Sequence, residues 1–143
     1  MPILISIRKK YVDRIFDGFK RLEFRKFFPE NYKGTLVIYE CGPESCHKIV
    51  GRFRTEKATK FDPSLGITEE VQECVKCTDY TMADVEALNA LQEPTFIVPV
   101  QNPVRMAPVT LEEFSAQYKI VPVLTVPRSW TRFKCEASRS DKQ

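Results

Sequence analysis

The chain has 143 residues, of which 43% are apolar and 29% are charged, the proportions of a globular protein with one core. No apolar run approaches the roughly 18 residues that a membrane-spanning helix needs, so we do not expect a membrane protein. The N-terminal stretch MPILISIRKKY places its charges after its apolar residues, the reverse of a secretory signal. We therefore expect the protein in the cytoplasm.

The net charge of +3 is unevenly distributed along the chain. Residues 1–60 hold 14 basic and 7 acidic residues, residues 61–118 hold 2 and 10, and residues 119–143 hold 6 and 2. If the two basic ends meet in the fold, they form one positive face that attracts phosphates. The alternative is solvated charge with no ligand.

The first half of the chain predicts four short strands and one helix. The strands are expected at residues 3–7, 21–25, 35–41 and 48–56. The helix is expected over residues 9–18, and Gly18 stands where the end of a helix needs a left-handed backbone. Because only a loop separates the last two strands, we expect them to form a hairpin.

From Asp62 onward the pattern changes to short acidic helices and strands that contain proline. The expected helices are residues 69–75, 83–91 and 111–118, with N-caps at Thr68, at Thr81 or Met82, and at Thr110. Residues 95–106 predict a strand in which Pro99 and Pro103 indicate an edge or a bulge. Residues 127–133 predict a last strand.

Together these elements give an α/β chain, of the α+β kind, whose sheet is mixed or antiparallel and too irregular for a doubly wound fold. We expect one domain over residues 1–135. The polar end EASRSDKQ, residues 136–143, has the composition of a disordered tail.

The stretch DGFKRLEFRK, residues 17–26, places three ionisable groups next to a predicted turn. With the turn at Gly18, Lys20 lies just before a strand from which Glu23 and Arg25 project on the same side. We therefore expect these three side chains to share one cleft. A carboxylate between two cations can accept hydrogen bonds from a nucleobase edge, while the cations hold phosphate or carbonyl oxygens.

Two other interpretations of the same residues remain open. If Lys20 is present as a neutral amine, it can act as a base or nucleophile while Glu23 moves protons. Lys20 and Glu23 are then the catalytic candidates of an enzyme. The structural interpretation is a cross-strand ion-pair network that binds no ligand.

The five cysteines are an odd set without framework-like spacing, which suits a reducing compartment and free thiols. The alternative is a zinc site formed by Cys41, Cys46 and His47 with Cys74 and Cys77. Cys46 and His47 are adjacent, which rarely lets both reach one ion, and the segment before Cys77 predicts a helix with ordinary thiols. We therefore expect no metal and no cofactor.

The motif GFKRLEFR has the pattern G-x-K-x-x-E-x-R and resembles the motif of ASCH domains. The resemblance covers residues 1 to about 133. The segments TLVIYECGP, KIVGRFR and PRSWTRF are similar to the family's hairpin and to its closing Pro-x-Ser-aromatic segment. The resemblance implies a β-barrel related to the PUA fold, with flanking short helices and a cleft lined by the motif.

The resemblance implies a role connected with RNA. Some family members are thought to bind RNA, and we expect this chain to bind RNA or a modified nucleoside through Lys20, Glu23 and Arg25. Others are reported to cleave RNA or to hydrolyse an N4-acylated cytidine, with Lys20 as the implied catalytic amine. The amidohydrolase members have threonine where this chain has Glu23. Candidates for their further acidic residue are Glu69, Glu70, Glu73 and Asp84.

Near the basic C-terminus, Ser129 and Trp130 are further candidates for nucleic-acid binding. The indole face of Trp130, next to Arg128 and Arg132, suits stacking on a base of single-stranded RNA. The alternative is a core tryptophan, because an indole can bury a large apolar area. The lone histidine, His47, stands in a polar loop, where we expect it to be solvated.

Overall fold

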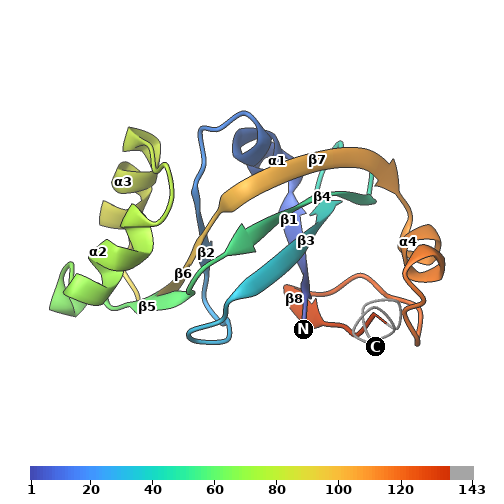
Figure 1. Ribbon diagram of the computed structural model, residues 1–143. Helices are drawn as coiled ribbons and strands as arrows, with labels where there is room; N and C mark the ends of the chain where they lie inside the picture. The colour runs from blue at the N-terminus through green and yellow to red at the C-terminus, as the bar shows by residue number, and fades with distance from the viewer. Residues whose placement is uncertain (136–143) are drawn as a thin grey trace.

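The computed structural model describes residues 1–135, and the tail predicted at residues 136–143 lies outside them. Within the described part, two β-sheets and four α-helices are arranged as Figure 1 shows. The strands are β1 (Ile3–Arg8), β2 (Leu22–Arg25), β3 (Gly34–Cys41), β4 (Ile49–Thr55), β5 (Thr59–Phe61), β6 (Thr95–Pro99), β7 (Gln101–Val109) and β8 (Trp130–Arg132). The helices are α1 (Lys9–Phe16), α2 (Glu69–Lys76), α3 (Met82–Asn89) and α4 (Leu111–Gln117), with a 3₁₀ turn at Pro63–Leu65.

The larger sheet has five strands in the order β7-β4-β3-β1-β8. β1 runs parallel to β3 and the other neighbours run antiparallel, so this sheet is mixed. The smaller sheet is antiparallel, in the order β2-β6-β5. The expected α+β class and the expected hairpin of β3 and β4 are therefore confirmed.

Two strands of the larger sheet continue into the smaller one. β4 leads into β5 after a short link, and β6 leads into β7 through Val100. Because β4 pairs with β7 and β5 pairs with β6, the two continuous segments form a bent bridge between the sheets. The long sweep of β6 and β7 across the molecule is visible in Figure 1.

The structure corrects the expectation of a closed β-barrel, because both sheets are open over residues 1–135. Closure would require β2 to pair with β1 or β8. Side chains span that distance instead: Arg25 Nη2 donates to the Ser6 carbonyl oxygen at 2.6 Å, and Trp130 Nε1 donates to the Phe27 carbonyl oxygen at 2.9 Å. The outer edge of β2 therefore has no strand partner within the described residues.

The main core fills the space between the larger sheet and α1. Ile3, Ile5 and Ile7 of β1 are at most 2% exposed. They pack with Val12 and Ile15, which lie on one face of α1 at helical spacing. The predicted helix α1 therefore packs against β1. This packing fixes the position of the C-terminal end of α1.

The predicted caps Thr68 and Thr110 are confirmed, and of the two alternatives Thr81 and Met82 the cap is Thr81. Thr68, Thr81 and Thr110 each accept a hydrogen bond from a backbone N–H three residues further on, at the starts of α2, α3 and α4. Asp84 and Glu113 complete capping boxes in α3 and α4. The apolar faces of α2 and α3 pack against the smaller sheet, so the acidic middle of the chain covers that sheet.

The sequence did not indicate β5 or the division of residues 95–106 into two strands. β5 has three residues, too few to show an alternating pattern. The expected edge position is confirmed for Pro103, because β7 is the outer strand of the larger sheet and its register against β4 shifts. It is wrong for Pro99, which ends β6, the central strand of the smaller sheet.

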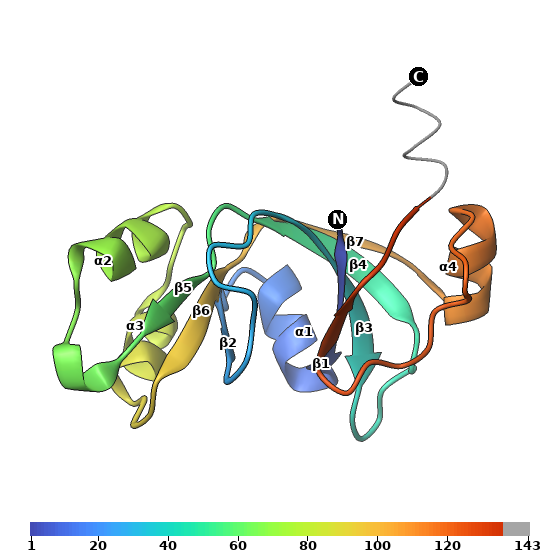
Figure 2. The same ribbon diagram turned by 90° about the horizontal axis from the view of Figure 1, so that it is seen from below.

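The two basic ends of the chain meet in the larger sheet, where β1 pairs with β8 and Ile3 lies opposite Arg132. Figure 2 shows α2 and α3 at one end of the molecule and α4 at the other. The condition for one positive face is thus met, while its contact with phosphates stays a prediction. Within residues 1–135, none of the helices combines the length and the apolar character of a membrane span.

Candidate functional site

The candidate site begins at the turn between α1 and β2. The N–H groups of Phe19 and Lys20 both donate to the Arg14 carbonyl oxygen, at 2.9 and 3.1 Å, and Gly18 has a φ of 87°. The helix therefore ends at a left-handed glycine, as predicted. Because the chain reverses here, Lys20 lies just before β2 and next to α1.

Glu23 joins the predicted group into one ion-pair network. Lys20 Nζ lies 3.3 Å from Glu23 Oε1, and Arg25 Nη2 lies 2.8 Å from Glu23 Oε2. The side chains of Lys20, Glu23 and Arg25 are 13%, 7% and 15% exposed, so most of the network is out of water. The structure confirms that these residues come together, whereas their roles toward a ligand stay a prediction.

Further hydrogen bonds fix the three side chains. Lys20 Nζ donates to the Leu22 carbonyl oxygen at 2.6 Å. Arg25 Nη1 donates to Ser129 Oγ at 3.0 Å, while its Nη2 reaches Ser6 and Glu23. Arg25 and Ser129, both predicted to bind nucleic acid, therefore form a bridge from β2 to β1 and to the segment before β8.

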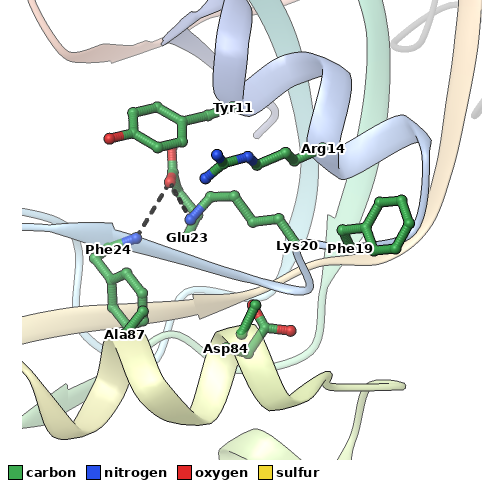
Figure 3. Close-up of a pocket in the computed structure, with 9 residues that line it drawn as sticks. Tyr11, Arg14, Phe19, Lys20, Glu23, Phe24, Asp84 and Ala87 are labelled. Carbon is green, nitrogen blue, oxygen red and sulfur yellow. Dashed lines mark hydrogen bonds and ion pairs between the residues drawn. The ribbon is translucent and has the colours of Figure 1, made fainter.

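A cavity of about 300 Å³ opens beside this network (Figure 3). Its lining comes from α1, the turn, β2 and α3: Tyr11, Arg14, Phe19, Lys20, Glu23, Phe24, Ala83, Asp84 and Ala87. Lys20 Nζ lies 5.4 Å from the centroid of the Tyr11 ring and 5.1 Å from that of Phe24. The volume is at the lower end of small-ligand sites, and the mixture of rings and charges suits a flat polar ligand.

Asp84 is the one among the four acidic candidates that lines the cavity. Its buried carboxylate accepts hydrogen bonds from the backbone N–H groups of Arg21, Leu22 and Thr81, at 3.0, 3.2 and 2.9 Å. It therefore ties the first turn of α3 to the start of β2. The capping-box pattern predicts the bond to Thr81, whereas the contact with β2 depends on the tertiary fold.

Trp130 lies at the start of β8 and is half-buried against the main core. Its ring centroid is 5.5 Å from that of Phe28, with the rings at 60° to each other. The contact with Phe28 and the partial burial of Trp130 thus support the interpretation of this tryptophan as a core residue. Its role in stacking a base stays a prediction.

All five cysteines are free thiols, and burial is the main cause that raises the pKa of four of them. The effect is largest for Cys74, whose pKa is raised to about 11. Over the part of the chain that the structure describes, no three His, Cys, Asp or Glu side chains gather as a group that could hold a metal ion. His47 is exposed in the loop between β3 and β4.

No protein-family model matches the sequence, and a search of curated proteins finds no match either. Solved structures do match. The ASCH protein from Zymomonas mobilis is 16% identical, with a TM-score of 0.64 over 99% of this chain and 93% of that chain. Two single-residue variants of that protein match at 15% identity with the same TM-score, over 99% of this chain and 96% and 94% of theirs.

The chain therefore has the fold of an ASCH domain, and the resemblance found in its sequence is confirmed at the level of the fold. At this identity a shared fold does not imply a shared activity, so the function depends on the residues of the site.

Proposed function

We propose that this protein binds a nucleobase, carried by RNA or by a modified nucleoside, in the cavity beside Lys20 and Glu23. The observation that supports it best is a buried, ion-paired carboxylate in the wall of a cavity that aromatic rings also line. A nucleobase is recognised by the same combination, because rings stack on its flat face while polar groups bond to its edge.

The donors and acceptors in the cavity complement a base edge. Lys20 has three N–H donors, of which one bonds to Leu22 and one faces Glu23, so a third is left for a carbonyl oxygen of the ligand. Each oxygen of the Glu23 carboxylate can accept more than one hydrogen bond, including one from an amino group such as that of cytosine. Arg25 and Ser129 contribute by holding Glu23 in place.

Catalysis on the bound base would call for a second group that transfers protons. The carboxylates that line the cavity are Glu23, which is ion-paired, and Asp84, whose oxygens accept hydrogen bonds from Arg21, Leu22 and Thr81. Both are engaged in fixing the protein itself. Binding without turnover is therefore the function that this geometry supports best.

Calorimetric titration with cytidine, N4-acetylcytidine and uridine tests the proposal. Glu23→Gln keeps the shape of the side chain but replaces an acceptor oxygen by a donor. It should change the ratio of the affinities for cytidine and uridine by about tenfold, the size of one polar base contact. The control is Glu56→Gln, which removes an exposed carboxylate paired with Lys33 at 2.9 Å and should leave the ratio unchanged.

Lys20→Arg separates binding from catalysis, because arginine keeps the charge but cannot serve as a neutral amine. Mass spectrometry should recover the nucleosides and short RNAs intact after incubation with either the wild type or this variant. Products that form with the wild type and disappear with Lys20→Arg would instead show an enzyme. Failure of every nucleoside and short RNA to bind would contradict the proposal itself.

A further inference from the structure

Two phenylalanines on either side of β2 present their rings to solvent. Phe19 is 65% exposed and Phe27 is 73% exposed. A ring left in water gains little of the free energy that burial of its apolar surface would give, so exposed aromatic residues are informative where they cluster with other recognition groups. Phe19 lines the cavity, whereas Phe27 lies outside its lining.

Phe27 belongs to a cluster of two aromatic rings and two cations. Lys26 Nζ lies 5.9 Å from the centroid of the Phe27 ring, and the guanidinium carbon of Arg132 lies 5.8 Å from that of Trp130. The hydrogen bond from Trp130 Nε1 to the Phe27 carbonyl oxygen, 2.9 Å long, joins the two halves. We call these four residues, Lys26, Phe27, Trp130 and Arg132, the aromatic platform.

The platform carries positive charge that has no ion-pair partner among residues 1–135. Over residues 1–135, no carboxylate lies within ion-pair distance of Lys26 or Arg132, and both residues are exposed. Aromatic faces beside unpaired cations are the features that hold single-stranded nucleic acid, because bases stack on the rings and phosphates meet the cations.

The cavity and the platform are linked by β2 and the two residues that follow it. Glu23 is at the cavity, Arg25 bridges to β1, and Phe27 follows two residues later. β2 ends at Arg25 and the chain bends at Lys26 and Phe27, so the four steps from Glu23 to Phe27 span at most about 13 Å. One strand of a stacked duplex advances about 3.4 Å per nucleotide, so up to about four nucleotides at that spacing cover this distance.

We propose that the ligand of this site is a single-stranded RNA of about four or more nucleotides, with one base in the cavity and a neighbouring part of the strand on the aromatic platform. This inference rests on the proposed function for the cavity and extends it to a second contact point. Contacts in the cavity determine which base is bound, and contacts with the platform increase the affinity for the strand.

Fluorescence anisotropy with labelled RNA hexamers tests the platform, and the nucleosides that bind the cavity serve as the comparison. Phe27→Ala should weaken hexamer binding by about 5- to 150-fold, the value of one stacked base, and leave nucleoside binding unchanged. The fold should survive this change because the ring is exposed and the hydrogen bond from Trp130 goes to the backbone. The matched control is Tyr80→Ala, because Tyr80 is an exposed aromatic residue between α2 and α3. This variant should bind the hexamer as tightly as the wild type does.

The outcomes separate the two proposals. Hexamer binding that is unchanged in Phe27→Ala but altered in Glu23→Gln would overturn the platform and leave the cavity proposal standing. RNA hexamers that bind no more tightly than the nucleosides do would also overturn the platform proposal. A poly-aspartate peptide bound as tightly as the hexamer would show charge attraction alone, and tighter binding of a deoxyribose hexamer would overturn the assignment to RNA.

Discussion

Glu23 accepts hydrogen bonds from the Phe24 backbone N–H and from Arg25, and it forms an ion pair with Lys20. Moving charges out of water has a cost that a buried ion pair only partly recovers, so this network is weak evidence for a gain in stability. Its geometry, however, fixes one carboxylate within the wall of a cavity. The arrangement is better explained by the positioning of a recognition group than by stabilisation of the fold.

Gly51 in β4 leaves room for the Phe16 ring of α1 to pack against the larger sheet. A Cβ atom at this position would clash with the Phe16 ring and would lie 2.5 Å from the Val104 carbonyl oxygen. Gly51→Ala should therefore lower the free energy of unfolding by about 1–3 kcal/mol, the usual cost of overpacking, as measured by urea denaturation.

A double-mutant cycle with Phe16→Ala checks the cause of that loss. Removing the ring relieves the main clash, so Gly51→Ala should cost less in the Phe16→Ala background, although the contact with Val104 remains. An equal cost in both backgrounds would mean that the clash with Phe16 is not what destabilises the variant.

At the scale of single elements, α3 does more than cover the smaller sheet. Through Asp84 it holds the backbone N–H groups of Arg21 and Leu22, the residues that lead into β2. The same carboxylate caps α3 at Thr81. The position of Lys20 beside the cavity therefore depends on a helix that starts more than sixty residues later in the chain.

Asp84→Ala should destabilise the protein by about 2–4 kcal/mol, because several backbone donors lose their acceptor and each loss out of water costs about 1–3 kcal/mol. The control is Glu113→Ala, which removes the equivalent residue of the capping box in α4. Glu113 is exposed, and within residues 1–135 its side chain bonds only to Thr110, so its loss should cost about 1 kcal/mol or less. Urea denaturation measures both, and equal losses would show that the link to β2 adds nothing.

Local chemistry explains which parts of the molecule the sequence predicts. Some features involve only residues within a few positions of one another: the threonine caps, the left-handed Gly18 and the alternation at β2. The sequence therefore predicts them, and with them the proximity of Lys20, Glu23 and Arg25. The bond from Arg25 to Ser129 spans 104 positions. Such contacts depend on how the two sheets lie relative to each other, so the sequence does not predict the open edge of β2.

At the scale of the whole molecule, acidic and basic residues are concentrated in different parts of the fold. Residues 61–93, which contain α2 and α3, hold one basic and eight acidic residues, whereas pairing of β1 with β8 brings the basic ends of the chain together. The cavity lies between α1 and α3, at the border of these regions. An RNA strand with one base in the cavity would be repelled on the side of the acidic helices and attracted along β2 toward Lys26 and Arg132.

This charge arrangement predicts how RNA binding depends on salt. If about three or four phosphates meet cations along β2, the logarithm of the hexamer affinity should fall against the logarithm of the salt concentration with a slope of about −2 to −3. Nucleosides carry no phosphate, so their slope should be near zero. Replacing Lys26 and Arg132 together by glutamine should make the hexamer slope shallower by about 1.4, while Lys76→Gln in α2 should leave it unchanged. A hexamer slope near zero in the wild type would remove phosphate contact as a basis of binding, since nothing else in the proposed site would release counterions.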